Sequence, residues 1–380
     1  MSSTRQKIPV LDAFRFVAAF SVAIVHYEIV FGTTLLNGYF ATTAVSWFFM
    51  VSGFILSYTY PELTRSADLR RFYLHRVIRI YPVYFLAVMV SALFIVSAYA
   101  SHGEGLFTLI NRPFEISYDL PEEKSGRFWF GATLRHLVFL QSLHPMETLK
   151  LVFNGPLWSL VLEMYFYLVF PLLLLLLRPV KTRVAIFVTL LALYVLQFLL
   201  IQLNLPEAES YNIMNLNVPV YTNPFIRGIE FLMGMLLFKL FDLAPVKEKM
   251  TRSALWQAVI SVAIFSGVIL WVTPHVPYQY SAFFLEVPLV GYMVWTFLQL
   301  HWYPGDAAVR NCALLGGMSY VLYCFHWPVM EMLKYSQWWP DTAPGPIHVF
   351  MVVCVLLLAS FAIYRFVESP MRRLLYRRFG

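Results

Sequence analysis

The feature that most limits the fold of this chain is a series of long apolar segments. Segments in hydrocarbon must satisfy their own backbone hydrogen bonds, which favours helices. Only 13% of the 380 residues are charged and 59% are hydrophobic, whereas soluble domains usually carry about 25% charged residues. The sequence therefore predicts an all-α polytopic membrane protein. About ten transmembrane helices are expected, near residues 10–32, 38–60, 79–100, 153–177, 184–203, 222–244, 254–274, 281–300, 314–334 and 347–367.

The positions of Lys and Arg predict how these helices are oriented. If the N-terminus is cytoplasmic and every segment crosses, the cytoplasmic pieces hold nineteen basic residues. The external pieces hold five, all in 101–152, where six acidic residues accompany them. This asymmetry follows the positive-inside rule. We therefore expect cytoplasmic N- and C-termini in a multi-pass protein of the inner or plasma membrane. The net charge of +7 then reflects topology and contact with membrane lipids, and no nucleic-acid partner is expected.

Residues 101–152 form the one long connection between the expected helices. Within it, Phe128–Leu143 mixes aromatic and basic residues, so it can lie along the outer interface or dip into the protein. Long loops of this kind are often functional. We detect no internal repeats, and we expect residues 1–380 to form a single transmembrane domain.

Arg15 and His26 lie inside the first apolar segment, where ionisable side chains are costly. Eleven residues of helix return to nearly the same face, about 16 Å further along the axis. Intramembrane ionisable residues are functional by default. The pair therefore predicts a buried reaction site.

Glu163 and His326 are expected at depths from which they can converge with His26. A histidine beside a carboxylate makes a serviceable general base. Other interpretations stay open, because Glu163 can make a packing hydrogen bond or pair with a buried cation. His326 lies just before Pro328 and can instead satisfy a backbone carbonyl that the proline frees. Arg227 and Glu230, three residues apart, are expected to form an internal salt bridge.

Arg76 and Arg79 share one helix face at the cytoplasmic entrance to the third expected helix. Their position suits a phosphate-bearing cosubstrate, because guanidinium groups bind phosphate through two hydrogen bonds. The two arginines end a basic cytoplasmic loop at residues 61–79. Retention of this loop in the cytoplasm and its contact with anionic lipid are the simpler explanation of its many charges. The sequence has no metal-ligand cluster and no Gly-rich phosphate loop, so no metal is expected.

Taken in order, these residues resemble the acyltransferase-3 family of integral membrane enzymes. The first-helix Arg and His appear as Arg15 and His26. An Arg-x-x-Arg signature appears as Arg76 to Arg79, followed by Ile80-Tyr81-Pro82. The resemblance covers nearly the whole chain through further matches at Phe48–Phe54, at Pro156–Glu163, at Gly317–Tyr323 with His326 and Pro328, and at Glu368-Ser369-Pro370.

The resemblance implies transfer of an acyl group, most simply acetyl, from cytoplasmic acyl-CoA to a hydroxyl of a carbohydrate or glycolipid acceptor. We expect His26, helped by Glu163, to act as general base or to accept the acyl group. The third candidate catalytic residue, Arg15, is expected to act with Arg76 and Arg79 at the donor end of the site. Arg76 and Arg79 are expected to bind acetyl-CoA or another acyl-CoA. The residues expected to contact substrate are Trp158, Ser159 and His326.

Some family members carry a fused extracytoplasmic esterase-like domain. We expect none here, which leaves a separate extracytoplasmic transferase as a possible partner. A proton-coupled transporter or flippase of a lipid-linked sugar is the alternative function, with Arg15, His26 and Glu163 forming an ion path. The absence of repeats argues against it. A non-catalytic scaffold gives Arg15 and His26 no purpose. The sequence does not identify the acceptor or the acyl chain.

Overall fold

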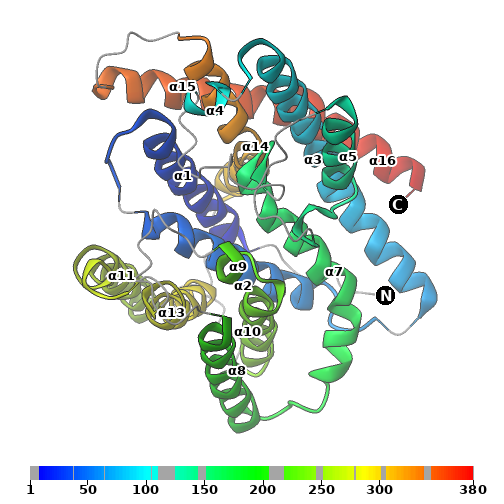
Figure 1. The fold of residues 1–380 in the computed structure, drawn as a ribbon. Coiled ribbons are helices and arrows are strands. Elements are labelled where there is room, and N and C mark those ends of the chain that lie inside the picture. Colours follow the sequence, from blue (N-terminus) through cyan, green and yellow to red (C-terminus); the bar gives the residue numbers. More distant parts are fainter. Residues whose placement is uncertain are drawn as a thin grey trace. The chain divides into compact units, whose positions relative to one another are not determined.

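Every regular element in the computed structural model of the chain is a helix, and no strand occurs in the residues that it describes (Figure 1). This confirms the all-α prediction. The described residues are 8–36, 38–63, 65–103, 105–109, 125–143, 151–204, 218–244, 251–277, 280–300, 305–337 and 344–379.

Eight helical stretches of the described chain are long and apolar enough to cross a membrane. They confirm a multi-pass membrane protein. They are α1 (Pro9–Phe31), α2 (Tyr39–Thr59), α3 (Ser66–His102), η2 with α7 (Gly155–Leu176), α8 (Arg183–Asn204), α11 to η4 (Arg252–His275), η5 with α13 (Ser281–Leu298), and α15 to α16 (Pro346–Phe379).

Two further predicted segments are also helical but do not meet the same measure of length and apolarity. They are α10 (Pro224–Asp242) and α14 (Asp306–Tyr335). The helix α10 carries four charged residues in nineteen, which lowers its apolar character. The total of ten spans and the cytoplasmic location of both termini therefore stay predictions.

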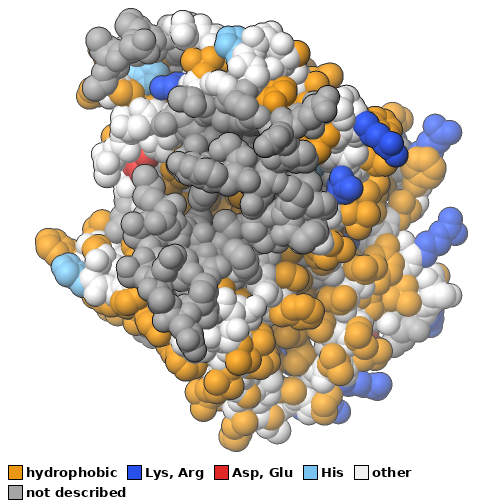
Figure 2. Space-filling view, viewed as in Figure 1, with side chains coloured by type: hydrophobic (Ala, Val, Ile, Leu, Met, Phe, Trp, Pro, Cys, Tyr) orange, Lys and Arg blue, Asp and Glu red, His pale blue; other side chains and the backbone are white. Residues whose placement is uncertain are grey.

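Large hydrophobic side chains cover much of the surface, and Figure 2 shows them over the visible face. The helix α8 illustrates this, because Phe187 is 57% exposed and Leu203 is 81% exposed. In a soluble protein such a face would be an aggregation hazard. In a membrane protein it is the surface that faces lipid.

The chain divides into two compact units. The first unit contains residues up to Ala18, Asn37–Arg65 and Tyr165–Gly316, and the second contains Ala19–Leu36, Ser66–Met164 and Gly317–Gly380. The helices α1, α7 (Trp158–Leu176) and α14 each begin in one unit and end in the other.

In the first unit, α2 and α10 pack with their backbones in close contact. A Cβ atom added to Gly234 would lie 1.9 Å from the carbonyl oxygen of Met50. A Cβ atom added to Gly53 would lie 2.0 Å from the carbonyl oxygen of Phe231. Small residues at such crossings are typical of membrane helices, because they let dispersion contacts form along both backbones.

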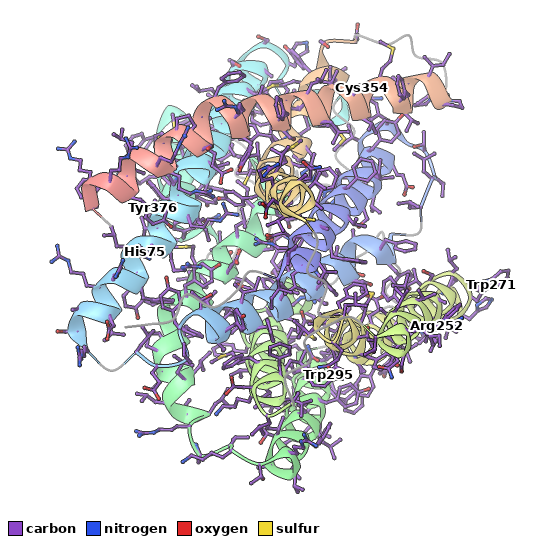
Figure 3. The ribbon with its side chains drawn as sticks, turned by 180° about the vertical axis from the view of Figure 1, so that it is seen from behind. His75, Arg252, Trp271, Trp295, Cys354 and Tyr376 are labelled. Carbon is purple, nitrogen blue, oxygen red and sulfur yellow. The ribbon has the colours of Figure 1, made fainter. Side chains whose placement is uncertain are left out.

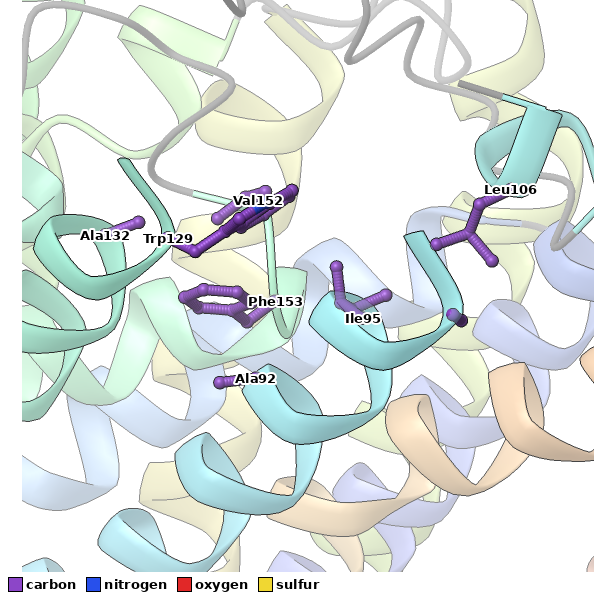
Figure 4. Close-up of a cluster of buried hydrophobic side chains, with 8 residues drawn as sticks. Ala92, Ile95, Leu106, Trp129, Ala132, Val152 and Phe153 are labelled. Carbon is purple, nitrogen blue, oxygen red and sulfur yellow. The ribbon is translucent and has the colours of Figure 1, made fainter. Parts of the chain in front are cut away.

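In the second unit, described parts of the long connection pack against the C-terminal half of α3. The helix α5 (Gly126–Leu137) buries Trp129 and Ala132 in a hydrophobic cluster, while Phe130 stays 71% exposed. The segment Phe128–Leu143 is therefore partly an amphipathic helix covering α3. Figure 4 shows the cluster, whose members are Ala92, Ile95, Ala98, Leu106, Trp129, Ala132, Val152 and Phe153; Leu106 belongs to the short helix α4 (Gly105–Leu109).

The N-terminal turns of α3 lie beside α16 (Ser369–Phe379) in the same unit. The rings of His75 and Tyr376 meet edge to face, with centroids 5.1 Å apart (Figure 3). At 37 residues, α3 is about 55 Å long, whereas the hydrocarbon core is about 30 Å thick. The helix therefore extends beyond the hydrocarbon, and its basic N-terminal part is a helix rather than a loop.

Candidate active site

The second unit brings two of the predicted site residues into direct contact. Nδ1 of His26, on α1, lies 2.7 Å from Nε2 of His326, on α14. The two imidazole rings are nearly parallel, at 5°, with centroids 5.0 Å apart. His326 is fully buried and His26 is half-buried. The structure therefore joins residues that are 300 positions apart in the sequence.

The hydrogen bonds of His326 indicate which nitrogens carry protons. Nδ1 of His326 lies 3.0 Å from the carbonyl oxygen of Leu322, one turn earlier, so Nδ1–H donates to that oxygen. In the neutral ring, Nε2 of His326 is then an acceptor. It accepts from Nδ1–H of His26, which leaves Nε2 of His26 with its lone pair. The pair can therefore present His26 as a base or a nucleophile.

Aromatic side chains of α14 surround this pair. The ring of Trp327 meets His26 edge to face, with centroids 5.1 Å apart and planes at 87°. The ring of Tyr323 lies 5.8 Å from that of His326. These contacts restrict the orientation of both imidazoles, since packed rings cannot rotate freely.

Hydrogen bonds join the N-terminus of α7 and the residues just before it to α14, within one turn of His326. The hydroxyl groups of Ser159 and Tyr323 lie 2.7 Å apart. Nδ2 of Asn154 donates to the carbonyl oxygen of Cys324 at 2.9 Å. Trp158 and Ser159 are both buried. The structure therefore places these two residues beside the histidine-bearing helix, and their contact with substrate stays a prediction.

Glu163 lies on α7 in the same unit, one turn after Ser159, and is half-buried. The hydrogen-bond partner of His26 in the structure is His326. The assisting role predicted for Glu163 stays a prediction. Arg15 belongs to the first unit and is also half-buried, on the same continuous helix as His26.

The two arginines of the Arg-x-x-Arg signature have different surroundings. NH1 of Arg79 forms an ion pair with Oε1 of Glu368 at 2.7 Å, and its guanidinium lies 5.5 Å from the centre of the Tyr320 ring. Arg372 pairs with the same carboxylate oxygen at 3.2 Å. The guanidinium of Arg76 lies 6.0 Å from the centre of the Phe72 ring. Arg79 is therefore held in place, and its charge is partly offset before any ligand binds.

Sequence reasoning missed three residues that support this site. Tyr27, beside His26, donates or accepts a hydrogen bond of 2.6 Å with Nδ1 of His348 on α15. The Glu28 carboxylate accepts from the backbone N–H groups of Leu35 and Leu36. The carboxylate of Glu368 pairs with Arg79, whereas the sequence marks this residue only as part of the Glu368-Ser369-Pro370 match. In the sequence these three residues differ from others only in lying next to or within a motif. That position does not reveal which distant residue each one contacts.

The first unit holds a separate buried polar network around Arg227. NH1 of Arg227 pairs with Oε1 of Glu230 at 2.8 Å, and both side chains are fully buried. This confirms the internal salt bridge predicted for these residues. Nearby, Oε2 of Glu286 accepts hydrogen bonds from Thr42 and Thr43. No group of three or more His, Cys, Asp or Glu that could hold a metal occurs in the described residues.

The eight long apolar helices define the class of the chain as a multi-pass membrane protein, with the His26–His326 pair among them. The particular family follows from comparison with known sequences. The acyltransferase-3 family model, described as an acyltransferase domain, matches residues 8–365. The chain therefore belongs to this family and is an acyltransferase.

Several known proteins are similar to this chain along nearly all of its length. It is 25% identical to the acyltransferase MdmB of Streptomyces mycarofaciens, covering 98% of this chain and 93% of that protein. It is 23% identical to the peptidoglycan O-acetyltransferase OatA of Listeria monocytogenes and 22% identical to OatA of Staphylococcus aureus. The match covers 97% and 98% of this chain but only 56% and 58% of the two OatA proteins. No solved structure matches the chain.

Proposed function

We propose that this protein transfers an acyl group, acetyl in the simplest case, from acyl-CoA to a hydroxyl group of a carbohydrate. The observation that carries the proposal is the His26–His326 pair, which leaves Nε2 of His26 able to accept a proton or form a bond. Acyl transfer to a hydroxyl needs such a group, because a neutral hydroxyl is a weak nucleophile.

In the direct route, Nε2 of His26 removes the proton from the acceptor hydroxyl as its oxygen attacks the thioester carbonyl. The carbon–sulfur bond then breaks, and the proton on His26 passes to the departing thiolate to give free CoA. His326 stabilises the imidazolium by accepting its Nδ1–H hydrogen bond. The products are an ester and a thiol, with no net gain or loss of protons.

In the two-step route, Nε2 of His26 attacks the thioester carbonyl itself and CoA thiolate leaves. The acceptor hydroxyl then attacks the acyl-imidazole, and its proton leaves through solvent or the released thiolate. Both routes use the same nitrogen and need the same hydrogen bond from His26 to His326. An acyl group retained on the protein in the absence of acceptor distinguishes the second route.

Arg76 and Arg79 are proposed to bind the phosphates of the donor at the cytoplasmic side. The half-buried guanidinium of Arg79 is fixed by Glu368, which orients its remaining N–H groups. In this arrangement Glu368 neutralises part of the charge of Arg79, and the N–H groups that do not pair with this carboxylate can bind a phosphate. Arg15 is proposed to help at the donor end of the site.

The acceptor class is proposed from the relatives, since OatA proteins are named as O-acetyltransferases and one as acting on peptidoglycan. A cell-surface glycan or a lipid-linked sugar fits a membrane enzyme of this family. MdmB, named only as an acyltransferase, matches over 93% of its own length.

The test compares glycans and small metabolites by mass spectrometry in cells carrying the wild type, no protein, and H26A. An added acyl mass that needs the wild type and is lost with H26A is the expected result. H26A should reach the membrane at wild-type level, because His26 is half-buried and its loss leaves no charge unpaired. Wild-type acylation by a well-expressed H26A would contradict the role of His26. Movement of an unmodified sugar across the membrane would favour the transporter.

A further inference from the structure

Trp327 carries a buried hydrogen-bond donor that has no acceptor in the part of the chain that the structure describes. The side chain is 5% exposed, and its Nε1 has no hydrogen-bond partner among the described residues. Leaving a buried donor unsatisfied is costly, because the group has lost its hydrogen bonds to water. Most buried polar atoms in proteins are paired, so an unpaired one calls for an explanation. An indole N–H can only donate, so its missing partner must be an acceptor atom.

The place of this donor in the fold indicates which acceptor it meets. Trp327 follows His326 directly in α14, and its ring meets the His26 ring edge to face at 5.1 Å. A group that reacts at Nε2 of His26 therefore comes within reach of the Trp327 side chain. An acyl group brings one strong acceptor to this position, its carbonyl oxygen.

Trp47 in the first unit provides a contrast. Its Nε1 is also buried and without a hydrogen-bond partner among the described residues. However, its ring packs against the rings of Phe14 at 5.7 Å and Phe297 at 5.6 Å, between centroids. The phenyl faces offer only weak N–H acceptors. Trp47 therefore has a packing role, whereas Trp327 adjoins a reactive imidazole.

We propose that Nε1–H of Trp327 donates a hydrogen bond to the carbonyl oxygen of the acyl group while that group reacts at His26. The inference rests on the proposed acyl transfer. When the acceptor oxygen or Nε2 of His26 adds to the carbonyl carbon, the carbonyl electron pair moves to its oxygen. The negative oxygen accepts a stronger hydrogen bond than the neutral carbonyl does. The electron pair returns when the carbon–sulfur bond breaks, and Trp327 stays unchanged.

Such a donor stabilises the transition state more than the bound donor substrate, so its loss lowers kcat more than it raises KM. We therefore compare W327F with W47F, since both remove one buried indole N–H and keep an aromatic ring. A second variant carries, at position 327, a tryptophan analogue in which sulfur replaces N–H. That analogue preserves the shape of the indole, which separates loss of the donor from loss of packing.

The experiment uses isolated membranes with their native acceptor, radiolabelled acetyl-CoA, and enzyme amounts matched by immunoblot. We expect kcat to fall about 100-fold in W327F and in the sulfur variant, with the KM for acetyl-CoA nearly unchanged. W47F should keep kcat near the wild-type value. A sulfur variant with wild-type kcat would overturn the proposal, whatever W327F shows. Absence of any transfer by the wild type would instead contradict the proposed function itself.

Discussion

The tautomers of His26 and His326 determine which nitrogen of His26 can act as a base or a nucleophile. Because Nδ1–H of His326 donates to the carbonyl oxygen of Leu322, its Nε2 is an acceptor for His26. In this arrangement a second group, His326, orients the base His26. Many enzymes use a carboxylate for that purpose, whereas here the second group is an imidazole. The second group holds the reactive ring in one tautomer. At the residue scale, we therefore propose that His326 orients the ring and that His26 reacts.

Replacing His326 tests this assignment. H326F removes the acceptor and should lower kcat for acyl transfer about 100-fold or more, because general-base catalysis contributes about 10²–10⁴-fold. H326Q supplies a carbonyl oxygen near the same place and should recover part of the loss. The measurement is the initial rate with labelled acetyl-CoA, at matched protein level. Equal rates for H326F and H326Q would argue against an orienting hydrogen bond.

At the scale of elements, the close crossing of α2 and α10 fixes the first unit. Gly53 and Gly234 each face the backbone of the other helix, and the buried Arg227–Glu230 pair lies within two turns of Gly234. A fully buried ion pair contributes little net stability, but breaking it by removing one partner is costly. The glycines therefore set the spacing of the helices, and a hydrogen bond of 3.2 Å from Arg227 to Oγ of Ser46 joins the ion pair to α2.

G234A should destabilise this crossing, because the added Cβ atom would lie 1.9 Å from the carbonyl oxygen of Met50. A backbone carbonyl cannot avoid this clash by a rotamer change, so the two helices would have to move apart. Overpacking typically costs about 1–3 kcal/mol. The matched control is G267A near the end of α11 (Arg252–Gly267), where an added Cβ atom has no neighbour within 4 Å. The measurement is Tm in detergent. We expect a clear fall for G234A and no fall for G267A, so equal Tm values would contradict the packing argument.

At the scale of the whole molecule, the predicted orientation in the membrane places the two ends of α3 on opposite sides. Ser66 begins the helix beside the basic cytoplasmic residues, and Ser101 lies near its outer end. The donor acyl-CoA is expected at the first end and the carbohydrate acceptor at the other. The length of α3 is more than sufficient to connect the two sides.

Thiol labelling measures this orientation directly. S101C should react with a membrane-impermeant maleimide in intact cells, while S66C should react only after permeabilisation, since both positions are exposed. The wild type provides the control, because its three cysteines are buried or half-buried and free of disulfides. Labelling of S66C in intact cells would reverse the predicted topology and move the acyl-CoA site to the outer side.

Much of the architecture and part of the site could be predicted from local patterns. The apolar segments predict the helices, and the costly position of His26 inside one of them marks it as a candidate for function. For His326 the sequence left a bond to a backbone carbonyl equally open. The pairing of Arg79 with Glu368 could not be predicted, since both were recognised only as parts of separate motifs. Nor could the contact of Tyr27 with His348, because no spacing rule links residues 321 positions apart.

The sequence by itself determined that this chain is helical, crosses a membrane and belongs to a family of acyltransferases. These properties depend on apolar length and on motifs, which are local along the chain. Only the tertiary structure decided that His26 bonds to His326 and that Gly234 lies against the backbone of Met50. It also decided that the Trp327 donor beside His26 has no acceptor among the described residues. These depend on how distant helices pack against each other. Packing is decided by the shapes of whole helix faces, which no single segment contains.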